Sequence, residues 1–404
     1  MKIFWLGGVV EEEKFKEMLE NGNTQIAANK TQLNYIEGIE EVTGENVKIL
    51  NSHYEPSFPK YKKLFVRKRI WKRKGKENVD IGFFNIPVFK YINKSIKLKI
   101  EMKKIMKNEL ANEDLNIFFI YAMTAPLMLL APFIERHIKD KKYKICLIVP
   151  DLPEFMNMSK QSIVKKILSK LNRKIIYNCM KYIDRYVLFA EPMADYLKLQ
   201  SKDYIAIEGM VTLKRENITK ENINSSEKNY IMYAGGMNEK YGVLSLVKAF
   251  TEIKNDEIEL WLYGKGDAVE KIMKIAEQDV RIKYKGIVTN EEILMLEKKA
   301  KLLVNPRPND EEYTKYSFPS KNMEYMLSGT SLLTTKLPAM PKEYYEYVYT
   351  LEGTSQTEIK NKIEEILRLT DDELIRKGKM AKEFVLKEKN AVVQAKKIIK
   401  FIND

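Results

Sequence analysis

A segment near residue 320 combines residue types that suit a phosphate-bearing ligand. Ser320 is expected to cap a short helix that Gly329 ends, and Lys321 falls on its first turn. Free backbone N–H groups at a helix start, together with a lysine, attract an anion. Glu324 lies one turn further on, where a carboxylate can accept hydrogen bonds from two adjacent ribose hydroxyls, and Arg307 precedes the segment. The pattern predicts a nucleotide site; the alternative is a capped helix with a surface glutamate.

Two glycine turns lie upstream of this segment, each after a β-rich run. Gly235 and Gly236 are followed by Lys240 and then by a helical pattern. Gly264 follows the next run, with Asp267 three residues later. Glycine lets the backbone approach a ligand closely, and a lysine adds a point charge. Either turn alone also suits an ordinary strand-to-helix connection, in which Asp267 caps the following helix.

The first half of the chain offers fewer candidates. Asp151 and Glu154 follow an apolar strand, and ligands of open α/β sheets bind at the carboxyl ends of strands. Asp151 is therefore a candidate for binding an acceptor hydroxyl, with helix capping as the equal alternative. His137 is interpreted as a helix-surface residue. No Walker loop, G-x-S-x-G elbow, H-E-x-x-H motif or D-x-D metal pair is found, so neither a metal nor a cofactor is expected.

The elements that would position these residues alternate between short β-rich runs and longer helical patterns. This alternation is typical of parallel sheets with crossover helices. An amphipathic helix is expected at 162–180 and long helices at 371–402. The predicted fold class is α/β, with two Rossmann-like domains facing a cleft. Strands are expected at 2–6, 47–51, 116–121, 144–149, 185–189, 230–234, 259–263, 282–284, 302–305, 331–334 and 347–349.

A length of 404 residues also favours two domains over one core. We predict an N-terminal domain over 1–212, a polar linker over 213–228 and a C-terminal domain over 229–385. A last helix, 386–404, is expected to cross back to the first domain. Only two cysteines occur, which suits a reducing, cytoplasmic compartment. The longest apolar stretch, 125–134, is too short to span a membrane, and no secretory signal is expected.

The net charge of +14 is concentrated in one stretch, from Lys60 to Lys76, which holds ten basic residues and no acid. Phe65 and Trp71 are interleaved with them. One interpretation is a solvated basic loop. Nucleic-acid binding would require a recognisable module, which is missing, so no nucleic acid is expected. We favour contact with an anionic membrane surface, into which the aromatic side chains would insert.

The second half resembles the donor domain of the family 4 retaining glycosyltransferases of the GT-B fold, especially bacterial capsular and exopolysaccharide enzymes. The most specific resemblance is the stretch 316–329. Segments 148–156, 186–194 and 208–209 are also similar to parts of those polymer-building enzymes. The resemblance covers most of the chain and implies an acceptor-binding first domain and a nucleotide-sugar-binding second domain.

The resemblance also implies roles for single residues. Glu324 matches the second carboxylate of the family's paired-glutamate motif, which holds the nucleotide ribose. Ser320 and Lys321 match the start of the diphosphate-binding helix, and Lys240 lies near the family's phosphate-binding basic residue. The residues that match the glycine turn below the diphosphate and the loop beside the base are Gly235, Gly236 and 286–288, the last ending at Val288.

The chain departs from the family pattern at three positions. The first glutamate of the pair is replaced by Tyr316, and the arginine after the first glycine is replaced by Gly236. The Lys–Gly step is interrupted by Tyr241. Arg307 is expected to supply the missing positive charge. We keep Gly264 and Tyr316 among the expected donor-site residues.

The expected activity is transfer of a sugar from a nucleoside diphosphate sugar to a hydroxyl of a glycan or polyprenyl-diphosphate-linked acceptor, in cell-surface polysaccharide synthesis. Lys321, Lys240 and Arg307 would stabilise the leaving diphosphate without a metal, and retention follows from the resemblance. The enzyme would be cytoplasmic, at the inner face of the membrane. The alternatives are transfer to a protein or small molecule, and a non-catalytic nucleotide-sugar-binding protein.

Overall fold

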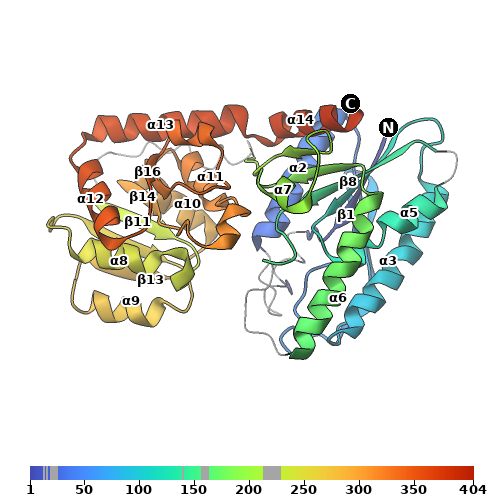
Figure 1. Cartoon of the computed structure of the whole chain (residues 1–404), viewed down its shortest axis with the longest axis horizontal. Helices are drawn as coiled ribbons and strands as arrows, with labels where there is room; N and C mark the ends of the chain where they lie inside the picture. The colour runs from blue at the N-terminus through green and yellow to red at the C-terminus, as the bar shows by residue number, and fades with distance from the viewer. Residues whose placement is uncertain (12–13, 15–16, 19–25, 139–140, 156–162, 213–228) are drawn as a thin grey trace. The chain divides into compact units, whose positions relative to one another are not determined.

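The computed structural model describes residues 1–404 except 12–13, 15–16, 19–25, 139–140, 156–162 and 213–228. The predicted linker, 213–228, lies outside the described residues. The chain divides into two compact units: unit 1 comprises 1–207 and 391–404, and unit 2 comprises 208–390 (Figure 1). Among the described helices, none has both the length and the apolar character of a membrane span.

Unit 1 is built on an eight-stranded sheet with the order β10-β9-β8-β7-β1-β2-β5-β4, parallel except for the antiparallel edge pair β4–β5. A small antiparallel ribbon pairs β3 with β6. The strands are β1 Lys2–Gly7, β2 Lys48–Asn51, β3 Phe65–Val66, β4 Arg69–Arg73, β5 Lys76–Asp80, β6 Phe83–Phe84, β7 Asn116–Tyr121, β8 Tyr143–Val149, β9 Arg185–Leu188 and β10 Tyr204–Ala206.

The helices of unit 1 form two layers. They are α2 Ile26–Thr43, α3 Phe89–Asn108, α4 Ala125–Met128, α5 Ala131–His137, α6 Ile163–Cys179, α7 Met193–Leu197 and α14 Ala391–Asn403. α2 packs against α14, while α3, α5 and α6 all contact α4. The chain runs from β1 to β2 in one direction along the sheet and from β7 to β10 in the other. Right-handed crossovers therefore place the two groups of helices on opposite faces of the sheet.

Unit 2 is built on a six-stranded parallel sheet with the order β13-β12-β11-β14-β15-β16. The strands are β11 Tyr230–Ala234, β12 Glu259–Tyr263, β13 Ile282–Gly286, β14 Leu302–Asn305, β15 Leu332–Thr335 and β16 Tyr349–Leu351. The helices are α8 Val243–Thr251, α9 Val269–Ala276, α10 Asn290–Lys299, α11 Ser320–Ser328, α12 Gln356–Leu367 and α13 Asp371–Glu388. The apolar strands are covered on both faces, as two buried clusters show.

The basic stretch 60–76 is a loop only in part, which corrects the first of its three interpretations: residues 60–64 and 67–68 lie outside strands, but Arg69–Arg73 and Lys76 belong to β4 and β5. β4 and β5 form a hairpin whose turn, Lys74–Gly75, has positive φ at both residues, 47° and 78°. Trp71 is buried, and its indole Nε1 donates to Asp80 Oδ1 at 2.8 Å. Trp71 therefore cannot insert into a membrane, whereas Phe65 is exposed.

Candidate functional site

Glycine turns meet at the carboxyl edge of the unit 2 sheet. Gly235 N donates to Tyr263 O at 2.9 Å, and Gly264 N donates to Gly286 O at 2.7 Å. Gly264 has φ of 138°, and a Cβ there would lie 1.8 Å from Gly235 O. Only glycine fits such an approach. The ends of β11, β12 and β13 therefore form a backbone surface on which a ligand can lie closely.

A second close approach joins the loop after β11 to the loop after β14. Gly242 has φ of 77°, and a Cβ on it would lie 1.9 Å from Pro306 O. The two loops end neighbouring strands of the sheet. This packing brings the predicted cations Lys240 and Arg307, which flank the approach, to the same part of the edge.

Lys240 and Arg307 share two aromatic neighbours. Lys240 Nζ lies 5.1 Å from the ring centre of Tyr241 and 6.0 Å from that of Tyr313. Arg307 Cζ lies 5.9 Å and 4.9 Å from the same two rings. One Arg307 nitrogen, Nη2, donates to Ser317 Oγ at 3.2 Å. Together these contacts form a positively charged site backed by tyrosines, which hold the cations through cation–π attraction.

Helix α11 begins one residue earlier than predicted. Pro319 occupies the N-cap and no side chain caps the helix, so Ser320 is its first helical residue and not the cap. Ser320 therefore does not occupy the position from which an N-cap side chain accepts hydrogen bonds from the first turn. Gly329 ends the helix with φ of 82°, as predicted. No side chain therefore caps the backbone N–H groups at the start of α11, where the helix dipole has its positive end, and Ser320 is exposed.

A buried amide fixes α11 to the sheet. Asn322 Nδ2 donates to Thr334 Oγ1 at 3.0 Å, and its Oδ1 accepts from Asn305 Nδ2 at 2.6 Å. Asn322 and Thr334 are fully buried. The first turn of α11 is thus tied to the ends of β14 and β15, which holds its N–H groups in place. No sequence pattern indicates this role, because an asparagine within a helix is not by itself distinctive.

Lys321 lies between two carboxylates. Its Nζ is 3.2 Å from Glu324 Oε2 on the same helix and 3.8 Å from Glu297 Oε1 on α10. Glu297 is fully buried, whereas Glu324 is partly exposed. Below them, the Tyr325 hydroxyl accepts from Ala234 N at 2.7 Å. Burial, and then the charge of Glu297, raise the pKa of Tyr325, which therefore stays protonated.

Glu297 was not foreseen, because nothing in its spacing separates it from the surface charges of an amphipathic helix. The remaining predicted residues are more loosely related to the site. Val288 packs partly buried against the core, and Gly236 O accepts from the Tyr233 hydroxyl at 2.9 Å. Tyr316 is half-buried just after a 3-10 turn. Asp151 is exposed and follows β8 in unit 1.

Unit 1 contains a buried charged cluster that sequence reasoning also missed. Asp80, at the end of β5, accepts from Asn51 at 2.9 Å and from Trp71 at 2.8 Å through Oδ1. Its Oδ2 lies 3.1 Å from His53 Nε2 and 3.2 Å from Lys14 Nζ. Burial alone would raise the pKa of Asp80, but His53 and Lys14 hold it well below its usual value.

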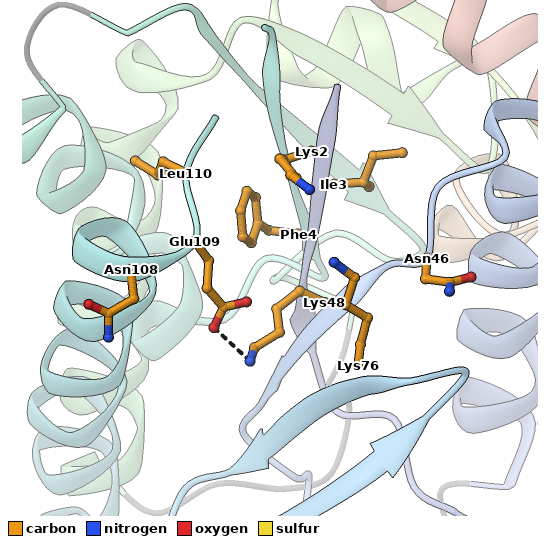
Figure 2. Close-up of a pocket in the computed structure, with 9 residues that line it drawn as sticks. All are labelled: Lys2, Ile3, Phe4, Asn46, Lys48, Lys76, Asn108, Glu109 and Leu110. Carbon is orange, nitrogen blue, oxygen red and sulfur yellow. Dashed lines mark ion pairs between the residues drawn. The ribbon is translucent and has the colours of Figure 1, made fainter. Parts of the chain in front are cut away.

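A pocket of about 320 Å³ lies at the opposite edge of the same sheet (Figure 2). Lys2, Lys48 and Lys76 stand at the amino ends of β1, β2 and β5, and Lys48 pairs with Glu109 at 2.7 Å. Substrates of open α/β sheets bind at the carboxyl ends of the strands. The pocket therefore lies away from the edge on which a substrate is expected.

Residues 228–369 match the family model described as "Glycosyl transferases group 1". The match covers a little over a third of the chain and includes β11, α11 and Glu324. It falls on the part of unit 2 that holds the glycine turns, Lys240, Arg307 and Lys321. A search of curated proteins gives no match.

Solved structures resemble the whole chain. Sucrose-phosphate synthase from Thermosynechococcus elongatus is 13% identical, with 99% of this chain and 98% of that chain covered and a TM-score of 0.65. Anabaena HepE in complex with UDP is 13% identical, with 100% of each chain covered and a TM-score of 0.65. The catalytic domain of starch synthase IV from Arabidopsis thaliana, bound to ADP and acarbose, is 8% identical, with coverage of 100% and 99% and a TM-score of 0.66. The predicted fold class, α/β with two Rossmann-like domains of the GT-B type, is confirmed.

Proposed function

We propose that the protein is a glycosyltransferase that binds a nucleoside diphosphate sugar at the carboxyl edge of the unit 2 sheet. The observation that carries the proposal is the convergence of three features there. A side-chain-free glycine surface, the uncapped start of α11 and the cations Lys240, Arg307 and Lys321 all lie at the ends of β11, β12 and β14 or on α11. Backbone N–H groups with nearby cations are the usual partners of a diphosphate.

The chemistry follows from where charge develops. The bond between the anomeric carbon and the diphosphate oxygen breaks, and its electron pair stays on the diphosphate. The oxygen of an acceptor hydroxyl forms the new bond to the anomeric carbon, and the hydroxyl proton leaves with the diphosphate. The start of α11, Lys321, Lys240 and Arg307 stabilise that leaving charge. Glu324 accepts hydrogen bonds from the ribose hydroxyls, and Asp151 in unit 1 binds the acceptor hydroxyl. Retention of configuration rests on the resemblance to family 4 enzymes.

The structural relatives support a nucleotide donor. HepE binds UDP, and starch synthase IV binds ADP with acarbose, so this architecture accommodates both pyrimidine and purine nucleotides. A thermal-shift screen of nucleotide sugars tests which one this chain binds, because binding stabilises the native state in proportion to the logarithm of ligand over dissociation constant. If no nucleotide sugar shifts the melting temperature, the proposal is wrong.

The acceptor is proposed to be a glycan carried on polyprenyl diphosphate, as in capsule or exopolysaccharide synthesis, at the inner face of the membrane. The basic stretch from Lys60 to Lys76 would contact that surface. Exposed Leu64, Phe65 and Ile70 support this, although Trp71 does not. Equal activity on a lipid-free protein or small molecule would favour the other acceptors. A non-catalytic binding protein would show nucleotide-sugar binding without transfer or hydrolysis.

Replacing Glu324 with alanine is expected to weaken nucleotide binding by about 1.5–3 kcal/mol, because charge-assisted hydrogen bonds to the ribose are lost. The affinity is measured by calorimetric titration with the nucleotide found in the screen. The control is Glu365→Ala on α12, which also removes the acid of an (i, i+3) pair with a lysine, Lys362, at 2.8 Å. Equal affinities for the wild type and Glu324→Ala would remove Glu324 from the site.

Activity is expected to survive removal of divalent ions, because the phosphate charge is assigned to lysine, arginine and helix amides. Donor turnover is measured after EDTA treatment and again after magnesium or manganese is added. Turnover within about twofold of the untreated enzyme is expected, since the proposed electrostatic stabilisation needs no ion. Loss of turnover that either metal restores would contradict the assignment.

A further inference from the structure

Exposed apolar side chains are concentrated in one part of the described chain. Twenty-one large apolar residues are exposed, of which twelve lie between residues 58 and 100, four lie on α6 and five lie in unit 2. Single exposed apolar residues are normal on a soluble protein, but a concentration of them marks an interaction surface. The excess of exposed apolar side chains on unit 1 therefore indicates an interaction surface there.

Helix α6 carries two parallel rows of side chains on its exposed side. Ile167, Leu171 and Ile175 form an apolar row at spacing (i, i+4, i+8), with exposed fractions of 57%, 54% and 40%. Lysines at 166, 170 and 174 form a second exposed row beside it. The helix contains no acidic residue. Such a basic, apolar exposed face is the pattern of a helix that lies in a membrane interface.

Helix α3 has an exposed apolar face in addition to its buried one. Leu98 and Met102 are buried against unit 1. On the other side, Ile92, Ile96 and Ile100 follow each other at spacing (i, i+4, i+8), with exposed fractions of 57%, 52% and 45%. The second apolar face cannot be explained by the core of the unit, because the core already covers the first.

The two helices belong to the same layer of unit 1. Both α3 and α6 pack against α4, and the topology places all three on one face of the sheet. The exposed sides of both helices therefore lie on the same side of the unit 1 sheet. A flat partner could contact both at once.

Charge separates this surface from the basic stretch 60–76. Six of the ten cations of that stretch pair with acids outside it; Lys63 pairs with Glu17, for example, and Arg73 and Lys74 pair with Glu40. On α6, in contrast, no carboxylate in the described part of the chain pairs with the lysines at 166, 170 and 174. The positive charge of these three lysines lies beside the apolar row and complements an anionic surface.

We propose that the exposed faces of α6 and α3 form the surface through which this protein binds an anionic lipid bilayer. The apolar rows enter the interface, and the lysines contact the lipid phosphates. The proposed function enters only as the reason for membrane binding, since a protein bound through this surface would lie close to a lipid-linked acceptor. The proposal moves the main contact from the basic stretch 60–76 to the two helices.

The test is co-sedimentation of the full chain with phosphatidylcholine vesicles that do or do not contain phosphatidylglycerol. We expect binding only to the anionic vesicles. Reversing Lys166, Lys170 and Lys174 to glutamate should weaken that binding roughly a hundredfold or more. The matched control reverses Lys396, Lys397 and Lys400 on α14, which change the net charge equally but lie in the other layer. Equal losses in the two variants would overturn the proposal, because net charge alone would explain them.

A second pair of variants tests the apolar row. Ile167→Ser, Leu171→Ser and Ile175→Ser together should weaken binding at least about tenfold. The control changes exposed Met273, Val280 and Met295 to serine, on unit 2, with little expected effect. The triple α6 variant must keep its melting temperature, since its side chains are exposed. The proposal would be overturned if the wild type did not bind vesicles, or if α6 mediated self-association instead. Nucleotide affinity should be unchanged in all variants, so a failure of the membrane proposal can be distinguished from a failure of the donor-site proposal.

Discussion

Replacing Lys321 with glutamine should lower kcat for donor turnover about 10²–10³-fold, with a smaller change in KM. The loss of one preorganised group that faces the developing charge has an effect of this size. The geometry supports it, because Lys321 lies on the first turn of the uncapped helix α11, which Asn322 fixes to β14 and β15. Steady-state kinetics with the donor found by thermal shift measure the effect.

The neighbouring carboxylates make the control essential. Lys321 also lies 3.8 Å from the fully buried Glu297, so its replacement takes a positive charge away from a buried carboxylate. A loss of activity could then arise from local unfolding. Glu297→Gln in the Lys321→Gln background removes the buried charge and should restore the stability to urea. If it also restored kcat, Lys321 would act only by neutralising Glu297, and its assignment to the diphosphate would be wrong.

Most of the fold could be predicted because its strands are buried on both faces. β11, β12 and β14 are short runs of apolar residues bounded by polar turns, and their predicted bounds agree with the structure. β15 and β16 were predicted within two residues. The chain in these segments has one way to bury its side chains, so pattern and structure agree.

The strands of the basic hairpin could not be predicted in the same way. β4 and β5 lie at the edge of the sheet and expose their cations, so their sequence has no apolar alternation. Their stability comes from distant acids such as Glu40 and from the bond between Trp71 and Asp80. A short edge strand that depends on long-range pairing leaves little trace in local sequence.

The helix of the candidate site could be predicted from a local motif. α11 is ended by Gly329, as predicted, but it begins at Ser320, because Pro319 and not Ser320 is the N-cap residue. The contacts that assemble the site are long-range. The approach of Gly264 to Gly235 and the burial of Glu297 under Lys321 join residues far apart in sequence. Which glycine faces another backbone, and which glutamate is buried, depends on the packed sheet.

Replacing Asp80 with asparagine is expected to lower the free energy of unfolding by about 3–5 kcal/mol, the usual effect of removing one partner of a buried ion pair. The carboxylate lies within 3.2 Å of both Lys14 and His53 and is itself buried. The amide keeps the shape of the side chain but leaves the Lys14 ammonium without its counter-charge. Urea unfolding, followed by circular dichroism, measures the change.

The pH dependence separates an electrostatic effect of Asp80 from a packing effect. The folded-state pKa of Asp80 is depressed, so its stabilisation is fully present above the ordinary value, about 4. It is lost as pH falls through the folded value, and the difference between wild type and Asp80→Asn should therefore shrink in acid. Asp195→Asn, an exposed aspartate of the same unit, should change stability by about 0.5 kcal/mol or less. The difference in the free energy of unfolding between the wild type and Asp80→Asn could instead stay constant from neutral pH to about pH 3. Packing, and not charge, would then stabilise the end of β5.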